Sequence, residues 1–318
     1  MPFCNYCGRN ESSLITEYTR FEKNKVLKCK SCELVYLELG KSRREVESFY
    51  ATEYRKRSAM RVLSAEEHYY DKVIQQDARN RILFVGNCLD IRDKRVLEIG
   101  SASGRMLETL MEYGAKEAVG VELNEEFAAY TRERGFKVYD QPMEELNLRE
   151  EFDVIVSFFT LEHVYDPMVV FNSVWNALKQ GGSFLGEVPN QDDWRIKIFD
   201  NEVVKRLHYD PNHYFYFSPV TFRNYLETNA FENIRFETAE RYNSLIQLKN
   251  ILCVQNPATE EVDDILTRFI LPEKDEDDVR LQHVDDLKEC MFNRVFERGV
   301  NSELMGNCLR FFASRSEA

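Results

Sequence analysis

The segment 96–107, which reads VLEIGSASGRML, places one acid and three small residues at alternate positions. Glu98, Gly100, Ala102 and Gly104 form the pattern E-x-G-x-A-x-G. Small residues allow a sharp turn from a strand into a helix, and a ligand can then contact main-chain amides at the start of that helix. Taken alone, such a turn is also compatible with a plain loop.

A second acid, Glu122, ends the next apolar run, VGVEL, 18 residues beyond Gly104. A carboxylate at the end of this strand can accept hydrogen bonds from both hydroxyls of a ribose. The spacing therefore favours a nucleoside ligand over a plain loop. A nicotinamide dinucleotide is disfavoured because its G-x-G-x-x-G turn is absent, and a nucleoside with a short zwitterionic arm fits better.

Four cysteines form two pairs, CNYC (Cys4 and Cys7) and CKSC (Cys29 and Cys32), with 21 residues between the pairs. This spacing is typical of a four-thiolate zinc ribbon, whose closed ligand set makes the zinc structural rather than catalytic. Two disulfides are the alternative, which the lack of a secretion signal disfavours. The other cysteines lack ligand spacing and are expected to be small buried residues: Cys88, Cys253, Cys290 and Cys308.

Composition and charge limit the class of protein. The chain has 318 residues, 43% of them hydrophobic, and a net charge of −13. Its first residues lack a secretory pattern and no apolar run has the length of a membrane helix, so we expect a soluble, cytoplasmic protein with no membrane partner. The acidic balance disfavours nucleic acid, although a basic run could bind phosphate locally: Arg55, Lys56, Arg57 and Arg61.

Short apolar runs alternate with amphipathic segments from Arg95 onward: RVLEIG, EAVGVEL, FKVYD, FDVIVSFF and SFLGEVPN. Strands of this kind, each followed by a helix, predict a doubly wound α/β fold whose ligands bind beyond the carboxyl ends of parallel strands. Before them, Ser64 and Glu67 have the spacing of a capping box. A helix with one apolar side is expected to follow, with Tyr70, Val73, Ile74, Ala78, Ile82, Val85 and Leu89 on that side.

We therefore expect five regions: a zinc ribbon (1–40), a helical bridge (41–93), an α/β core (94–243), a helical insertion or lid (244–300) and a final strand of the core (301–318). The insertion is acidic, with PEKDEDDVRLQHVDDLKE at its centre. Such insertions commonly form lids or oligomer contacts, and a homodimer is therefore one possible assembly. The simpler interpretation of the charged run is a helix face exposed to solvent.

Three segments resemble, in order and spacing, the motifs of class I S-adenosylmethionine-dependent methyltransferases: VLEIGSASGRML, GVELNEEFAAYTRERG and FDVIVSFFTLEHVYDPMVVFNSVWNALKQGGSFLGEVPN. The resemblance covers about residues 95–242. The cysteine-containing leader is similar to the zinc-ribbon leader of a bacterial and archaeal subgroup that includes the sugar C-methyltransferases. The resemblance implies a Rossmann-like methyltransferase sheet and S-adenosylmethionine as the cofactor.

The resemblance also implies roles for individual residues. Glu98 would orient the turn and the methionine amino group, the turn would line the methionine portion, and Glu122 would hold the ribose. Leu123 and Met143 would lie on either side of the adenine. Ala102 stands where many members have glycine. The implied cofactor contacts are Glu98, Gly100, Ser101, Ala102, Gly104, Glu122, Leu123, Met143 and Phe158.

A sulfonium methyl group is already activated, so its transfer needs alignment and a base for the acceptor proton, for which histidine is the first candidate. The segment HYDPNHYFYFS resembles the H-E-H-x-x-Y-F-S stretch of the sugar C-methyltransferases, which aligns His213 with their base and Tyr216 with their tyrosine. Asn212 replaces their glutamate, which leaves oxygen as well as carbon methylation open. The aromatic run also has a structural interpretation as the entry to a helix that begins near Pro219.

His163 lies in TLEHV, just after the fourth apolar run. In some methyltransferases this segment reads E-x-x-E-H and binds magnesium, but Phe159 occupies the first acid position here. Glu162 and His163 alone would make a poor metal site. His163 is therefore a candidate for catalysis or substrate contact, or a packing residue.

These observations predict methyl transfer to a small hydroxylated acceptor such as a sugar, a sugar nucleotide or a secondary metabolite. An RNA methyltransferase is one alternative, because zinc ribbons can bind RNA, although the acidic balance counts against it. A non-catalytic zinc-ribbon adaptor is another, since a fold alone does not establish chemistry.

Overall fold

The computed structural model describes residues 3–20, 22–38, 40–54, 63–199, 202–241, 301 and 303–317. The predicted insertion, the basic run at 55–61, Cys253 and Cys290 lie outside the described residues. The chain forms two compact units: residues 1–39, 189–219 and 236–309 make up the first, and residues 40–188, 220–235 and 310–318 the second. The division into five regions stays a prediction.

Among the described residues, a sheet formed mainly by the second unit has seven strands: β4 (Arg95–Ile99), β5 (Glu117–Val121), β6 (Lys137–Tyr139), β7 (Phe152–Phe158), β8 (Leu178–Pro189), β10 (Phe231–Ala239) and β11 (Cys308–Arg315). Their order in the sheet is β10-β11-β8-β7-β4-β5-β6. The pairs β4·β5, β4·β7, β5·β6 and β7·β8 are parallel. β11 runs against β8, because Gly181 N–H donates to the Ser316 carbonyl while Arg310 lies beside Glu187. The predicted α/β fold with a mostly parallel sheet is confirmed.

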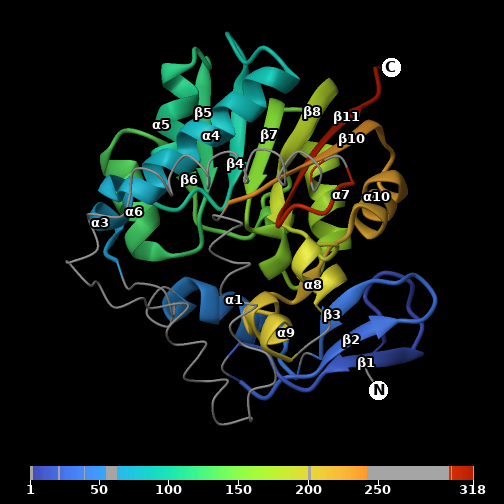
Figure 1. Ribbon diagram of the computed structural model, residues 1–318. Coiled ribbons are helices and arrows are strands. Elements are labelled where there is room, and N and C mark those ends of the chain that lie inside the picture. The colour runs from blue at the N-terminus through green and yellow to red at the C-terminus, as the bar shows by residue number, and fades with distance from the viewer. Residues whose placement is uncertain are drawn as a thin grey trace, which may run out of the picture. The chain divides into compact units, whose positions relative to one another are not determined.

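The described helices of this unit are α1 (Arg43–Thr52), α3 (Ala65–Tyr70), α4 (Lys72–Cys88), α5 (Arg105–Glu112), α6 (Glu125–Glu133), α7 (Pro167–Ala177) and α10 (Pro219–Thr228), with 3-10 turns η1 (Met143–Glu145) and η2 (Leu161–His163). Helices α4 and α5 cover one face of the sheet, where their apolar side chains form one core cluster with those of β4, β7 and β8 (Figure 1). On the other face, Phe171 of α7 packs on Phe184 of β8 and Phe222 of α10. Among the helices of the described ranges, none combines the length and the apolar composition of a membrane span.

The helix predicted after Ser64 is in fact two helices, α3 and α4. Asp71 has an extended backbone between them, and its side chain accepts hydrogen bonds from the N–H groups of Val73 and Ile74, which caps α4. Because this break redirects the chain, Tyr70 and Val73 are 58% and 61% exposed, and their predicted place on the buried side is wrong. Three later positions are buried as expected: Ala78, Ile82 and Val85.

The first unit contains an antiparallel sheet with the order β1-β2-β3-β9, formed by β1 (Ser12–Thr16), β2 (Val26–Cys29), β3 (Val35–Leu37) and β9 (Phe215–Tyr216). Its described helices are α8 (Trp194–Ile198) and α9 (Glu202–His208). Tyr216 pairs with Val35, so the aromatic run that follows α9 completes the sheet of the cysteine-containing leader. The sequence pattern does not predict this long-range pairing.

Candidate functional site

The segment between β4 and α5 forms the predicted sharp turn. Gly100, Ala102 and Gly104 have φ values of 79°, 46° and 77°, in the left-handed region that favours glycine. Gly104 is also the N-cap of α5. The Cβ of Ala102 makes this conformation unfavourable by about 1 kcal/mol.

The carboxylate of Glu122, directly after β5, holds this turn in place. Its Oε2 accepts a hydrogen bond from Ala102 N–H and its Oε1 from Asn124 N–H, both at 2.8 Å. An ionised carboxylate offers about four acceptor positions, so about two are left for further donors. Because Glu122 is only 9% exposed, a ligand bound there is largely shielded from water. The arrangement suits the two hydroxyls of a ribose.

Glu98, near the end of β4, is a buried acid whose Oε2 has no hydrogen-bond partner among the described residues. Burial raises the pKa of this carboxyl group to about 8. The group is therefore mostly protonated at neutral pH and ionises readily when a positive charge approaches. A buried acid without a partner is a feature expected where a ligand brings an ammonium group.

The other predicted cofactor contacts lie near the carboxyl ends of the same parallel strands. Leu123 follows Glu122 and is half-buried, Met143 begins η1, and Phe158 ends β7. Met143 and Phe158 are buried, as is Ser101 in the turn. The fold therefore gathers residues from separate motifs at one edge of the sheet. The placement of an adenine between Leu123 and Met143 stays a prediction.

A layer of charged residues on the α4 face of the sheet was missed by the sequence analysis. The carboxylate of Glu187, on β8, accepts hydrogen bonds from Arg81 Nε at 3.0 Å and from Arg310 Nε at 2.8 Å. The Glu187 side chain is only 6% exposed. In the parallel pairing of β7 and β8, Glu187 lies opposite Phe158. The available signal was a charge within an apolar pattern: Arg81 interrupts the apolar side of α4, and Glu187 interrupts the run SFLGEVPN.

His163 ends η2, which follows β7. The Tyr50 hydroxyl of α1 hydrogen-bonds to Nδ1 of His163 at 3.0 Å, and the rings of Tyr50 and Tyr54 lie 5.2 and 5.4 Å from the imidazole, measured between centroids. The carboxyl group of Glu162 is fully buried, and its Oε1 lies 3.9 Å from Nε2 of His163, beyond hydrogen-bond distance. Helix α1 therefore orients the His163 ring.

The candidates His213 and Tyr216 belong to the first unit. The Tyr216 hydroxyl donates a hydrogen bond to the Asp210 carbonyl at 2.7 Å, and burial raises the pKa of this phenol well above its usual value. The imidazole of His213 lies 6.1 Å from the Tyr216 ring. Tyr216 is thus a neutral phenol fixed to the backbone beside His213. His208, which the sequence pattern does not single out, is buried in the same unit, and burial lowers its pKa to about 4.

The four cysteines of the leader come together in the first unit. Their sulfur atoms all lie within 4.8 Å of one another, with 3.5 Å between Cys4 and Cys32 and between Cys7 and Cys29. None of the four forms a disulfide, so that alternative is wrong. Sulfur atoms bound to one tetrahedral zinc ion at about 2.3 Å would be about 3.8 Å apart, so this cluster could hold such an ion.

The thiols of this cluster differ in their tendency to ionise. Burial raises the pKa of Cys4 and of Cys32. Burial also acts on Cys29, but hydrogen bonds from the backbone at Cys32 and Ser31 outweigh it and lower the Cys29 pKa to about 7. A bound cation would favour the thiolate form of all four, since only thiolates are good zinc ligands.

Residues 67–235 match the profile of a family described as a methyltransferase domain. The α/β fold with its mostly parallel sheet agrees with this class of protein. Because the match covers more than half of the chain, the chain belongs to this methyltransferase family. The family supports S-adenosylmethionine as the cofactor, and the unpartnered Glu98 oxygen and the remaining acceptor positions of Glu122 fit its ammonium and ribose groups.

The relatives of the chain have several different functions. The ubiquinone biosynthesis O-methyltransferase of Idiomarina loihiensis is 30% identical over 135 residues, which are 39% of this chain and 55% of that protein. The tRNA U34 carboxymethyltransferase of Mannheimia succiniciproducens is 25% identical over 155 residues, 46% of this chain and 47% of that protein. The chain thus spans about half the length of the curated relatives it matches. A solved SAM dependent methyltransferase from Archaeoglobus fulgidus is 21% identical, covers 79% of this chain and 97% of its own, and has a TM-score of 0.49.

Glu98→Gln should remove a pH dependence from the stability of the ligand-free protein. The pKa of Glu98 is about 8 in the folded state, against an ordinary value of 4.5, so between these values the folded protein binds more protons than the unfolded chain. The free energy of unfolding therefore falls as pH rises through this window. Glutamine cannot ionise, so the variant should be similar to the wild type near about pH 5 and more stable at about pH 8.

Urea unfolding at several pH values measures this difference. Glu66→Gln, at an exposed position of α3, is the matched control and should keep the wild-type slope. Parallel stability curves for the wild type and Glu98→Gln would contradict the assignment.

Proposed function

We propose that the protein transfers the methyl group of S-adenosylmethionine to a small hydroxylated molecule, such as a sugar, a sugar nucleotide or a secondary metabolite. The observation that carries the cofactor assignment is the Glu122 carboxylate, fixed by two backbone N–H groups at 2.8 Å with acceptor positions left over. When bound, the cofactor would supply an activated methyl group: the nucleophile of the acceptor would attack the methyl carbon in line with the sulfur, the carbon–sulfur bond would break, and S-adenosylhomocysteine would leave. The residues of the chain then bind the cofactor, align the acceptor and remove its proton.

The cofactor contacts follow from the second unit. Glu98 receives the ammonium group, the turn from Gly100 to Gly104 lines the methionine portion, and Glu122 accepts the ribose hydroxyls. Leu123, Met143 and Phe158 supply apolar surface for the adenine ring and for the methionine arm of the cofactor. Their burial supports these roles, because a shielded site strengthens each hydrogen bond to the ligand.

The acceptor proton needs a base, and two histidines are candidates. His213 is the first, on its resemblance to the base of the sugar C-methyltransferases, with Tyr216 packed beside it. His163 is the second, and the Tyr50 hydrogen bond to its Nδ1 supports an oriented ring. The acceptor atom is an oxygen or an acidic carbon, and relatives that are named O-methyltransferases favour oxygen.

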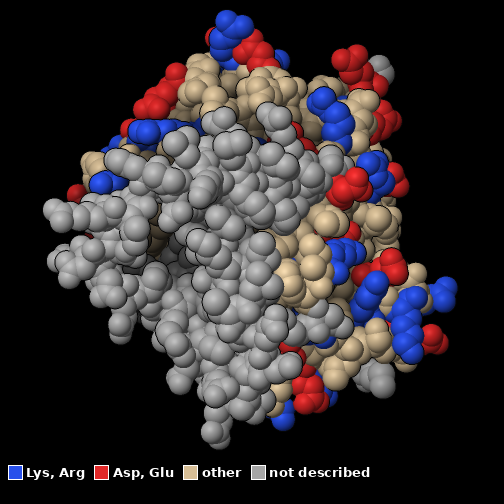
Figure 2. All heavy atoms as spheres, in the orientation of Figure 1, with Lys and Arg blue, Asp and Glu red and all other residues tan. Residues whose placement is uncertain are grey.

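An RNA substrate is the second candidate, because one relative is named as a tRNA carboxymethyltransferase. RNA binding depends on clustered positive charge, whereas this chain has a net charge of −13. On the face seen in Figure 2, Lys and Arg side chains of the described residues are interspersed with Asp and Glu. The charge distribution therefore favours a small acceptor. A homodimer and a cytoplasmic location stay predictions.

We also propose that the four clustered cysteines hold one structural zinc ion. The sulfur distances are close to those of a tetrahedral site, and four cysteine ligands leave no open position for a substrate. The strands beside this cluster are short, so the metal would supply much of the local stability.

Glu122→Ala should weaken binding of S-adenosylhomocysteine by at least about tenfold, because it removes two charge-assisted hydrogen bonds to the ribose. Isothermal titration calorimetry measures the affinity. Glu122→Gln keeps one acceptor oxygen, so its affinity for S-adenosylhomocysteine should fall by less than that of Glu122→Ala. Glu126→Gln, which alters the acid that accepts the Ala65 N–H, is the control and should bind like the wild type. An unchanged affinity in Glu122→Ala would refute the ribose assignment.

His213→Asn should keep the cofactor affinity and lower methyl transfer by about 10²–10⁴-fold, the usual contribution of a positioned base. The measurement is the transfer of labelled methyl groups from S-adenosylmethionine to a panel of sugar nucleotides and other hydroxylated molecules. His163→Asn is the comparison. If His163→Asn abolishes turnover while His213→Asn stays within about threefold of the wild type, the base is His163.

Cys29→Ser should release the metal from the first unit without affecting the cofactor site. We expect one zinc per chain in the wild type by elemental analysis and a large loss in the variant, because three thiolates bind the ion less tightly. Cys88→Ser, on α4, should keep the full zinc content. A metal-free wild type would contradict the proposal.

A further inference from the structure

The segment that carries His213 begins with a tight turn. His213 N–H donates a hydrogen bond to the Asp210 carbonyl at 3.1 Å, which closes a turn over residues 210–213. The sequence of the turn, DPNH, has Asp at the first position and Pro at the second, as turns of this kind prefer. The Asp210 carboxylate accepts a hydrogen bond from Asn212 N–H at 2.9 Å, and the Tyr216 hydroxyl donates to the Asp210 carbonyl. Asp210 therefore fixes the backbone that carries the His213 side chain.

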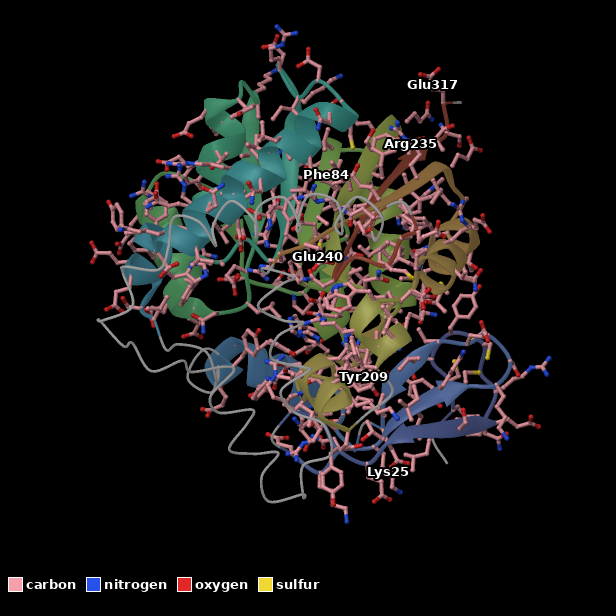
Figure 3. All side chains as sticks on the ribbon, in the orientation of Figure 1. Lys25, Phe84, Tyr209, Arg235, Glu240 and Glu317 are labelled. Carbon is pink, nitrogen blue, oxygen red and sulfur yellow. The ribbon has the colours of Figure 1, made fainter. Side chains whose placement is uncertain are left out.

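Arg20, in the cysteine-containing leader, holds the second oxygen of the Asp210 carboxylate. Its Nη1 donates to Asp210 Oδ2 at 2.9 Å, and its Nη2 donates to the Leu207 carbonyl, also at 2.9 Å. The backbone N–H of Arg20 donates to the carbonyl of Tyr209, which is labelled in Figure 3. The Arg20 and Asp210 side chains are each 19% exposed, so their ion pair is largely shielded from water. One residue of the leader thus holds the start of the His213 segment.

The leader also holds the other end of this segment. Leu37 N–H donates to the Tyr214 carbonyl at 3.0 Å, and Val35 lies opposite Tyr216 in the antiparallel pairing of β3 and β9. The leader therefore contacts the chain on both sides of His213. A base must be held in a fixed geometry to be aligned with an acceptor, and these contacts restrict the backbone of His213 in that way.

The main effect of the Arg20 contacts is on geometry rather than on stability. An ion pair that is shielded from water contributes little net stability, because the desolvation of both charges offsets their attraction. A guanidinium group donates in fixed directions, and here one N–H group meets Asp210 while another meets the Leu207 carbonyl. These two contacts set the position of the turn relative to the end of α9.

We propose that Arg20 is a positioning residue for the acceptor base: it fixes the turn at Asp210 and, through it, the orientation of His213. The inference rests on the proposed function, in which His213 removes the acceptor proton. It gives the cysteine-containing leader a role in methyl transfer in addition to the metal site that we propose there.

Arg20→Met tests this role, because methionine keeps an apolar stem and removes every side-chain donor. With an acceptor from the panel of sugar nucleotides and other hydroxylated molecules, we expect kcat to fall by about 10–100-fold, the effect of a displaced catalytic group. KM for S-adenosylmethionine should stay within about twofold of the wild type, because the cofactor contacts do not change. Arg20→Lys keeps the charge for Asp210 without the fork, so it should recover part of the loss.

The position of His213 can also be measured without an acceptor. In protein that contains isotope-labelled histidine, the imidazole NMR signal that disappears in His213→Asn belongs to this residue. In Arg20→Met this signal should shift, because the turn that holds the ring changes. Circular dichroism should show that the variant is folded. If Arg20→Met does not fold, Arg20→Lys serves for both measurements.

Thr16→Val is the matched control. Thr16 Oγ1 donates to Glu202 Oε1 at 3.1 Å, so this variant also removes a hydrogen bond between the leader and α9. It leaves the contacts of Arg20 and Asp210 in place. It should therefore keep the kcat of the wild type and an unchanged His213 signal.

A lower kcat with an unchanged KM, together with a shifted His213 signal in the Arg20 variants, supports the inference. An unchanged kcat where His213→Asn lowers it, an unchanged His213 signal, or the same effects in Thr16→Val would overturn it. Full turnover in His213→Asn would instead overturn the assignment of the base in the proposed function, and the role of Arg20 in methyl transfer with it.

Discussion

The edge of the sheet where we propose that the cofactor binds depends on one carboxylate, Glu122, which accepts hydrogen bonds from the N–H groups of Ala102 and Asn124. Ala102 belongs to the turn after β4, and Asn124 caps α6 after β5, so a single side chain joins the ends of two neighbouring strands. Asn124 extends the connection, because its side-chain amide donates to the Ala51 carbonyl of α1. The residue assigned to the ribose thus also shapes the turn that receives the methionine arm.

Helix α1 links the segments that follow three parallel strands. Asn124 follows β5 and bonds to α1, Arg43 of α1 pairs with Glu144 in η1 after β6 at 3.3 Å, and Tyr50 bonds to His163 after β7. Since ligands of doubly wound sheets bind beyond the carboxyl ends of the strands, one helix contacts the segments assigned to the ribose, the adenine and a candidate base. The geometry of these three segments is therefore coupled through the packing of α1.

The sequence predicts the strands and the turn because both follow local rules. Apolar runs identify β4 to β8, and small residues identify the turn, although only the structure shows that Ala102 adopts a left-handed backbone. Asp71 ends a helix that periodicity alone would continue, since a cap depends on one side chain rather than on a repeating pattern. The pair of Arg81 and Glu187 joins residues 106 positions apart, and no local rule connects them. The proposed role of His213 rests on resemblance, and that of His163 on its position after β7 and its hydrogen bond with Tyr50.

Two buried acids at this edge show two ways to accommodate a carboxyl group away from water. Glu187 is paired with two guanidinium groups, which fixes its position and its charge. Among the described residues Glu98 Oε2 has no hydrogen-bond partner, and burial favours the protonated form of this acid. Pairing gives a rigid element, whereas protonation leaves a group that changes its charge when a cation arrives. Binding an ammonium group at neutral pH then includes the loss of the Glu98 proton, which costs about 1.4 kcal/mol for each unit by which the pKa exceeds the pH. In the proposed site, a nucleoside without the ammonium group would not stabilise the ionised acid, so Glu98 would favour ligands with the complete arm through its own protonation equilibrium.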